Sequence, residues 1–299
     1  MDQRNLMNIV VSLNANYLKP LCVMLRSLLD ANPGGKVDVY VLHASLTPED
    51  FAFVRAALSD TRLSLFDVRV PEAFMADAPV LFHFPKEMYY RIFSVQLLPA
   101  SLGRALYLDP DMVVNRPLAP LYRMEMGSNF FAAARAINTI TQKEYKPRLN
   151  MPEESEYFNS GVLLMNLSEL RESQNCDEAM AFISSHREKL ILPDQDVLNA
   201  LYYDRTILLD PHIYNFDARY FNTVKVATLG KVDLKWVREN TAIIHYCGKG
   251  KPWHEYYLGE LGVFYREVAA KVFPEEAARK SPIEKLRDGL GSILESGES

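Results

Sequence analysis

The sequence predicts an α/β fold with a mixed, mainly parallel central sheet and helices on both faces. Three observations in the first seventy residues carry this prediction. Short β-branched runs alternate with segments whose apolar residues recur at helical spacing, proline and glycine separate these elements, and one helix start carries a full capping signal. Strands that alternate with helices in this way favour parallel pairing.

The first five elements follow in the order strand, helix, strand, helix, strand. Residues 7–13 form a β-branched run, and the helix after it ends at Pro33-Gly34-Gly35. Residues 36–43 alternate as the second strand. Thr47 is the expected cap of the next helix, with proline at the first helical position and aspartate three residues after the cap. Residues 62–68 form the third strand.

The rest of the chain is less regular. Residues 71–87 are irregular and rich in proline, and a helix is expected from about residue 88 to residue 98. A polar stretch over residues 138–155 separates two later strands. Further strands are predicted at residues 104–111, 129–136, 157–167 and 242–248. Without a clear composition break before about residue 277, we expect one domain over residues 1–277 and a tail over residues 278–299.

The composition argues against several classes of protein. The 299 residues are 48% hydrophobic and 24% charged, and the net charge is −5. A chain without a basic excess is not expected to bind nucleic acid. Three widely separated cysteines favour free thiols in a reducing compartment. We see neither a signal peptide nor an apolar run of the roughly 18 residues that cross a bilayer. A cytoplasmic enzyme or binding protein is therefore expected.

Polar clusters follow the predicted strands, where open α/β sheets bind ligands. The five clusters at strand ends or helix starts are Asn14-Ala15-Asn16, Asp109-Pro110-Asp111, Asn159-Ser160, Asp194-Gln195-Asp196 and His245. Asp109 and Asp111 point to the same side of an extended chain, which the proline between them favours. They form either a solvated turn or an oxygen site for Mg²⁺ or Mn²⁺, and an added imidazole favours Mn²⁺.

His245 is the candidate third ligand, or else a core histidine with a satisfied hydrogen bond. The sequence from it onward, HYCGKGKPW, supplies two glycines and the lysines Lys249 and Lys251. Glycine allows close backbone approach and lysine supplies a cation, a combination that suits a diphosphate. Asp194 is either a helix N-cap or a residue near a ligand, and Asn159 is equally compatible with an ordinary turn.

The ordered set of motifs resembles the family 8 retaining glycosyltransferases, which include bacterial lipooligosaccharide galactosyl- and glucosyltransferases. The matching segments are VVSLNANYLKPLCVMLRSL, YYRIF, ALYLDPDMVV, YFNSGVLLMNL, DQDVLN and HYCGKGKPWH. The resemblance covers about residues 7–257 and implies a GT-A fold with a Rossmann-like sheet. It also implies Mn²⁺, with Mg²⁺ possible, a UDP-hexose donor carrying galactose or glucose, and a saccharide or glycolipid acceptor.

The resemblance further implies roles for individual residues. The expected metal ligands are Asp109, Asp111 and His245. The expected donor-binding residues are Asn14, Asn16, Tyr17, Arg91, Gly248 and Lys251. The residues expected around the transferred sugar are Asn159, Asp194 and Gln195. His83 matches an acceptor-side histidine by its spacing from Arg91.

Two positions depart from the family pattern. Asn14 stands where an aspartate often accepts a hydrogen bond from uracil, and its amide oxygen can accept the same bond. Ala136 stands where the galactosyltransferases carry an acceptor-side aspartate, so we expect a different acceptor. A weak nucleotide-sugar binding protein, another donor and an inverting outcome stay open as alternatives. In the tail, balanced charges and glycines predict at most weak peripheral contact with the inner membrane face.

Overall fold

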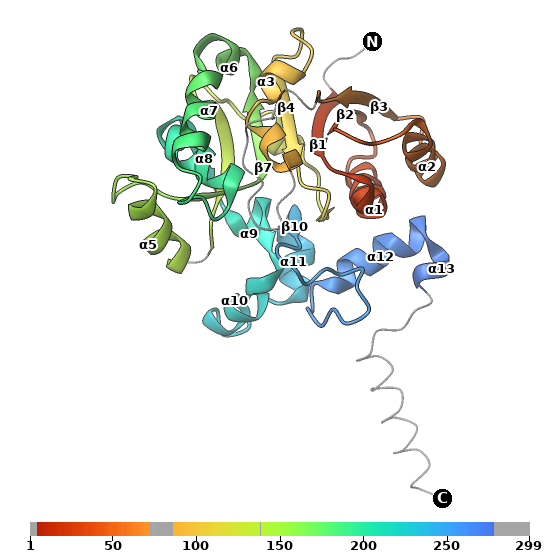
Figure 1. Cartoon of the computed structure of the whole chain (residues 1–299). Coiled ribbons are helices and arrows are strands. Elements are labelled where there is room, and N and C mark those ends of the chain that lie inside the picture. The colour runs from red at the N-terminus through yellow and green to blue at the C-terminus, as the bar shows by residue number, and fades with distance from the viewer. Residues whose placement is uncertain (1–4, 72–73, 75–85, 138, 278–299) are drawn as a thin grey trace, which may run out of the picture.

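The computed structural model describes residues 5–71, 74, 86–137 and 139–277. The expectations for His83 and for the tail lie outside this part of the chain. A seven-stranded sheet in the order β3-β2-β1-β4-β7-β6-β8 forms the centre (Figure 1). Its strands are β1 (Leu6–Ser12), β2 (Lys36–His43), β3 (Leu63–Arg69), β4 (Arg104–Leu108), β6 (Phe131–Arg135), β7 (Phe158–Asn166) and β8 (Thr206–Leu209).

The sheet is mixed and mainly parallel, as predicted. Among its described strands, β7 alone runs against both of its neighbours, β4 and β6. Leu108 at the end of β4 pairs with Val162 of β7. The residues that open β7 therefore lie at the edge where β4 ends, although they belong to the start of their own strand.

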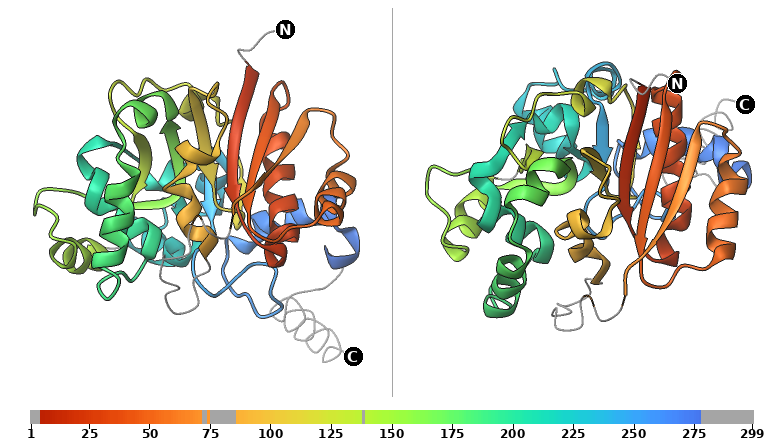
Figure 2. Two further views of the ribbon diagram at one scale, coloured as in Figure 1. Left: turned by 45° about the horizontal axis from the view of Figure 1, so that its top comes forward. Right: turned by 90° about the horizontal axis from the view of Figure 1, so that it is seen from above.

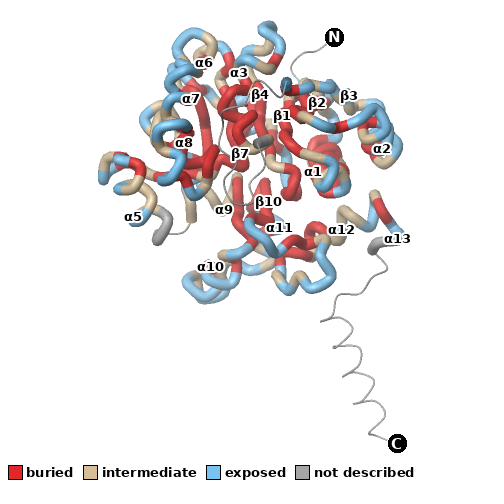
Figure 3. The backbone as a smooth tube through the Cα atoms, viewed as in Figure 1, coloured by how far each residue is buried: buried red, intermediate tan, exposed pale blue. Residues whose placement is uncertain are grey.

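Alternating side chains of the strands divide the apolar core between two faces. In β1, Ile9 and Val11 belong to one core and Val10 to the other. Helices on the first face are α1 (Leu18–Ala31), α2 (Pro48–Leu58) and α12 (Gly262–Val272). Helices on the second face are α6 (Leu167–Ser173), α7 (Cys176–Ser185) and α8 (Pro193–Tyr202). Figure 2 shows the two layers, and Figure 3 shows buried residues concentrated along the central strands.

Further helices, most of them short, occur in the described part of the chain. The α-helices are α4 (Ala119–Tyr122), α5 (Thr139–Arg148), α9 (Pro211–Tyr214), α10 (Phe221–Ala227), α11 (Leu234–Asn240) and α13 (Pro274–Ala277). The 3₁₀ helices include η2 (Ala15–Tyr17), η5 (Tyr203–Arg205) and η6 (Ala218–Tyr220). None of the helices within the described ranges is long and apolar enough to cross a membrane. The cysteines are free thiols, as predicted.

A second sheet lies beside the end of β4. It consists of β5 (Met112–Val114), β10 (Ile243–His245) and β9 (Phe216–Asp217). The central strand β10 is antiparallel to β5 and parallel to β9. The sequence predicts the late strand but not its partners, and it extends the β4 strand through residue 111, whereas β4 ends at Leu108.

Two further segments differ from prediction. The helix expected over residues 88–98 is divided into a 3₁₀ helix, η4 (Lys86–Arg91), and α3 (Ser94–Leu97). Residues 89–93 are all buried, which a regular amphipathic helix with one apolar face does not achieve. The polar stretch over residues 138–155 contains α5, whose low apolar content hides it from hydrophobic periodicity.

Candidate active site

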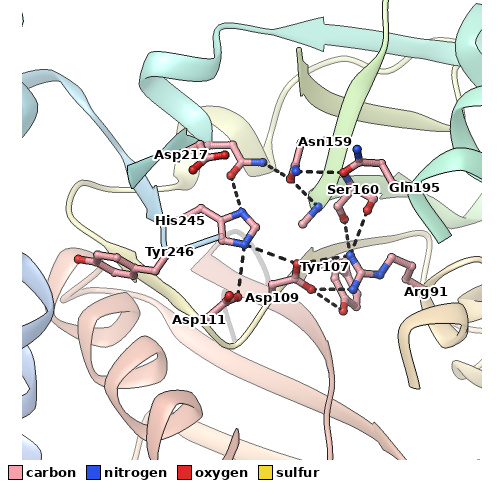
Figure 4. Close-up of polar contacts among 12 residues, drawn as sticks. Arg91, Tyr107, Asp109, Asp111, Asn159, Ser160, Gln195, Asp217, His245 and Tyr246 are labelled. Carbon is pink, nitrogen blue, oxygen red and sulfur yellow. Dashed lines mark hydrogen bonds and ion pairs between the residues drawn. The ribbon is translucent and has the colours of Figure 1, made fainter. Parts of the chain in front are cut away.

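The candidate site lies where β4 ends and β7 begins (Figure 4). The backbone N–H of Asp109, one residue after β4, donates to the Gly161 carbonyl of β7 at 2.9 Å. Because β7 is antiparallel to β4, Asn159 and Ser160 at its start lie near Asp109. His245, the last residue of β10, points to the same place from the second sheet.

Asp109, Asp111 and His245 offer ligand atoms that all lie within 4.8 Å of one another. The His245 Nε2 is 3.3 Å from Asp111 Oδ1 and 3.7 Å from Asp109 Oδ2. The pairing of His245 with Met112 sets this approach, because Asp111 directly precedes Met112. The structure thus brings together the residues expected to bind a metal, and their role stays a prediction.

The ligand atoms of these three residues and the space between them both fit a divalent cation. Two carboxylates and one imidazole suit Mn²⁺, and carboxylate oxygens also suit Mg²⁺. Gly161 keeps room for these ligands: a Cβ atom there would lie 2.4 Å from His245 Cε1 and 2.7 Å from Asp109 Oδ2. A glycine within a strand often marks such a close approach.

Lys251 places an ammonium group beside this cluster. It donates to Asp111 Oδ2 and, at 2.8 Å, to the Tyr246 carbonyl. Burial would raise the pKa of Asp111, but His245 and Lys251 hold it below its usual range. Burial would lower the pKa of Lys251, but Asp111 raises it. The pKa of His245 is also raised, because Cys247 and Asp111 outweigh its burial.

Arg91 connects the end of β4 to the start of α8. Its residue is 4% exposed, and its guanidinium donates to Asp109 Oδ1 at 2.8 Å and to the Ser160 carbonyl at 2.9 Å. It also lies 3.0 Å from Asp194 Oδ2 and 4.3 Å from the Tyr107 ring centroid. Burial raises the pKa of Asp194, an effect that the guanidinium opposes. Arg91 therefore binds the carboxylates of both Asp109 and Asp194. Its contact with a sugar-nucleotide donor stays a prediction.

Gln195 and Asn159 form an amide network at the start of β7. Asn159 Nδ2 and the Ser160 N–H donate to Gln195 Oε1 at 3.0 and 3.1 Å. The Ser160 hydroxyl donates to Asp194 Oδ2 at 2.8 Å. The N-cap of α8 is Leu192, without a side-chain capping bond, so the N-cap interpretation of Asp194 is wrong. Asp194 and Gln195 lie together in the first helical turn.

The residues expected near a nucleoside follow β1. Asn14 Oδ1 accepts the Asn16 N–H at 3.1 Å and caps η2. Tyr17 packs edge-on against Trp253, with ring centroids 6.0 Å apart. Gly248 has a φ of 80°, which glycine adopts without steric cost. The contacts of these residues with a nucleotide stay predictions.

Three site residues escaped the sequence reasoning. The Tyr107 hydroxyl donates to Asp109 Oδ1 at 2.9 Å, Asn215 contacts His245, and Gly161 provides the space described above. A glycine inside an apolar strand is a recognisable signal of close approach and points to Gly161. Tyr107 and Asn215 have no such local signal, because their importance depends on partners elsewhere in the chain.

This arrangement defines a class of protein. A mainly parallel sheet that ends in an Asp-x-Asp pair, with a histidine added from a late strand, is typical of the GT-A glycosyltransferases. The family profile described as Glycosyl transferase family 8 matches residues 8–256. The chain therefore belongs to glycosyltransferase family 8, which confirms the resemblance drawn from its motifs.

Individual relatives agree with this placement. A lipopolysaccharide 1,2-glucosyltransferase of Escherichia coli K12 is 27% identical over 261 residues, covering 87% of this chain and 76% of the relative. General stress protein A of Bacillus subtilis strain 168 is 29% identical over 269 residues, covering 85% and 90%. The solved galactosyltransferase LgtC, in complex with donor and acceptor sugar analogues, matches with a TM-score of 0.76 and 26% identity, covering 89% and 96%.

Proposed function

We propose that this chain is a metal-dependent, retaining hexosyltransferase that moves galactose or glucose from a UDP-sugar to a saccharide or lipid-linked sugar. The observation that carries the proposal is the cluster of Asp109, Asp111 and His245 with the Lys251 ammonium beside it. The relatives support the class of substrates, since one is named a lipopolysaccharide glucosyltransferase and another was solved with donor and acceptor sugar analogues.

The charged cluster is suited to a diphosphate leaving group. Asp109, Asp111 and His245 would hold the cation, which when bound supplies Lewis acidity to the phosphate oxygens. Lys251 adds a fixed positive charge, and Gly248 permits close backbone approach. Negative charge develops on the β-phosphate as the sugar departs, so positive charge fixed in advance lowers the barrier.

The amide network favours attack on the same face of the sugar from which UDP departs. Gln195 Oε1 is a neutral amide oxygen, a weak nucleophile that already accepts from Asn159 and Ser160. Asp194 is 1% exposed, and its Oδ2 is held by Arg91 and Ser160. We therefore assign both side chains to orienting the sugar in an oxocarbenium-like ion pair. A covalent glycosyl adduct on Asp194 or Gln195, detected by mass spectrometry, would overturn this assignment.

The acceptor side is proposed to differ from that of the galactosyltransferases. The methyl group of Ala136 cannot accept a hydrogen bond from a sugar hydroxyl. Ala136 lines a cleft of about 490 Å³ together with polar residues that include Gln142, Glu154 and His212. These side chains suit a hydroxyl-rich acceptor. The cytoplasmic location, the single domain over residues 1–277 and the weak membrane contact of the tail remain proposals.

A donor panel tests the proposed activity. The purified protein is incubated with UDP- and GDP-sugars, with Mn²⁺ and with EDTA, and nucleotide release is followed. We expect slow, metal-dependent release of UDP from UDP-galactose or UDP-glucose. Tight donor binding without any release would favour the weak nucleotide-sugar binding protein instead. Release from another donor would correct the hexose assignment.

The stereochemical outcome needs a separate measurement. Once an acceptor is found, the anomeric configuration of the product is read from its ¹H NMR coupling constants. Both UDP-hexose donors carry an α-linked sugar, so an α-linked product is expected for retention. A β-linked product would establish inversion and contradict the proposed mechanism while leaving the donor assignment intact.

A further inference from the structure

Asn215 links the candidate metal ligand His245 to the amide network at the start of β7. It lies between α9 and β9 and is 4% exposed. Its Oδ1 is 2.9 Å from His245 Nδ1, and its Nδ2 donates to Asn159 Oδ1 at 2.7 Å. Asn159 donates in turn to Gln195. One hydrogen-bonded chain of side chains therefore runs from the cation cluster to α8.

Two backbone N–H groups fix which side-chain atoms donate and which accept in this series of hydrogen bonds. The Gly161 N–H donates to Asn159 Oδ1 at 2.9 Å, and the Ser160 N–H donates to Gln195 Oε1 at 3.1 Å. A backbone N–H only donates, so both of these side-chain atoms are oxygens. The Asn159 atom that faces Asn215 is therefore an oxygen, so Asn215 donates to it through its NH₂ group.

This orientation turns the Asn215 oxygen toward His245, where it accepts the Nδ1–H. The Nε2 of the same ring then faces Asp111 and Asp109 at 3.3 and 3.7 Å. An amide turned the other way would donate to Nδ1 and leave the proton on Nε2, the nitrogen that faces the carboxylates. Asn215 thus sets which ring nitrogen is available to a cation.

We propose that Asn215 is a positioning residue that fixes the tautomer and orientation of His245 for metal binding. The inference rests on the metal role in the proposed function. Hydrogen-bond partners of ligating histidines typically contribute 10- to 100-fold in metal affinity. The same side chain anchors Asn159, so it joins metal binding to the placement of Gln195.

Two substitutions separate this role from plain structural support. Asn215→Ala removes both bonds, and Mn²⁺ affinity is expected to fall about 10- to 100-fold. Asn215→Asp keeps an acceptor toward His245 and loses the donor toward Asn159. Its Mn²⁺ affinity is expected to equal or exceed that of the wild type, because a carboxylate partner raises the basicity of the imidazole. Sugar transfer by Asn215→Asp is expected to fall, because Asn159 loses its anchor.

Asn32→Ala provides a matched control. Asn32 is also buried and also joins two groups, because its Nδ2 donates to the Leu28 carbonyl at 2.8 Å and its Oδ1 accepts the Leu118 N–H at 3.0 Å. Its loss is expected to lower the thermal stability and to leave Mn²⁺ affinity unchanged. Asn215→Ser repeats the alanine test with a smaller cavity if Asn215→Ala does not fold.

Mn²⁺ affinity is measured from the electron paramagnetic resonance signal of free Mn²⁺ during titration, with thermal unfolding of each variant in parallel. Weak binding by Asn215→Ala with retained binding by Asn215→Asp supports the proposal. Equal weakening in both variants, or unchanged binding by Asn215→Ala, overturns it. A wild-type protein that binds no Mn²⁺ overturns the metal role itself, and this inference with it. If that protein still transfers sugar, the proposed transferase activity holds and only its metal dependence and this inference fail. If it transfers no sugar either, the proposed function fails as well.

Discussion

The two sheets of this protein differ in how far along the chain their strands find partners. In the main sheet, β1, β2 and β3 pair in parallel within the first seventy residues, joined by α1 and α2. In the small sheet, β5 pairs with β10, and Lys251 just beyond β10 reaches Asp111 across 140 positions. Local alternation builds the frame, whereas long-range pairing assembles the charged cluster.

The largest effect is expected at the junction of the two sheets. In Gly161→Ala, the new Cβ would collide with His245 Cε1 at 2.4 Å and with Asp109 Oδ2 at 2.7 Å. Misplacing one site group lowers turnover by roughly 100-fold. Because His245 and Asp109 are both displaced, turnover is expected to fall by about 10⁴-fold. Donor hydrolysis and Mn²⁺ titration measure the effect. Gly34→Ala is the control, because no atom lies within 4 Å of its added Cβ. Near-normal turnover by Gly161→Ala would show that the site does not need this spacing.

Asp111→Asn tests the charge of the cluster without adding volume. The amide oxygen still accepts from Lys251, so the fold should remain intact. Losing the carboxylate is expected to abolish measurable Mn²⁺ binding and to lower turnover by roughly 10²- to 10³-fold. Circular dichroism verifies the fold, and the donor assay gives the rate. Full activity in the variant would refute the metal assignment.

The chain contains a second Asp-x-Asp segment, Asp194-Gln195-Asp196, and its Asp196 differs from Asp111 in having a structural role. Asp196 is 0% exposed. It accepts from Tyr157 at 2.6 Å, from two Arg148 nitrogens at 2.9 and 3.0 Å, and from the Ile191 N–H at 2.7 Å. Asp196→Asn leaves the partly buried guanidinium of Arg148 without its charge partner and should cost about 3 kcal/mol of unfolding free energy. Denaturant unfolding measures this cost, while Mn²⁺ affinity should be unchanged. A loss of metal binding without a loss of stability would reverse our division of roles.

The smallest effect is expected within the frame, at Thr47→Ala. The capping box at the start of α2 joins Thr47 and Asp50 through two reciprocal hydrogen bonds. Its loss should lower the unfolding free energy by about 1 kcal/mol and leave turnover as it is. Urea unfolding and the donor assay report these two quantities. A drop in turnover larger than the drop in stability would contradict the separation of frame and site.

The frame could be predicted because its signals are local. The β-branched runs, the proline and glycine breaks and the capping residues Thr47 and Asp50 each act within a few positions, so these local signals together place the first five elements. Asp109 and Asp111 were placed at the end of a strand for the same reason. The strand-end pattern also makes His245 the candidate third ligand, and the family resemblance implies that all three side chains bind one metal.

The remaining features depend on tertiary partners. An apolar run predicts a strand but not its direction in the sheet. The antiparallel direction of β7 is therefore set by its pairing with β4 and β6 and not by its own residues. Residues 89–93 form a broken helix because all of them are buried at once. Asn215 meets partners 30 and 56 positions away, which no sequence window covers.

The reversal of β7 has a consequence for anyone who redesigns this enzyme. Asp109 and Gly161 are backbone neighbours across β4 and β7, so the residues proposed to orient the transferred sugar and those proposed to bind the cation share one hydrogen-bonded strip. Libraries that diversify residues 157–161 to obtain a new donor would disturb cofactor affinity in the same step. Variation along the cleft near Ala136 and His212 changes a different surface. Under the proposed function, acceptor choice is therefore expected to be the easier trait to change, whereas donor choice and metal binding are expected to change together.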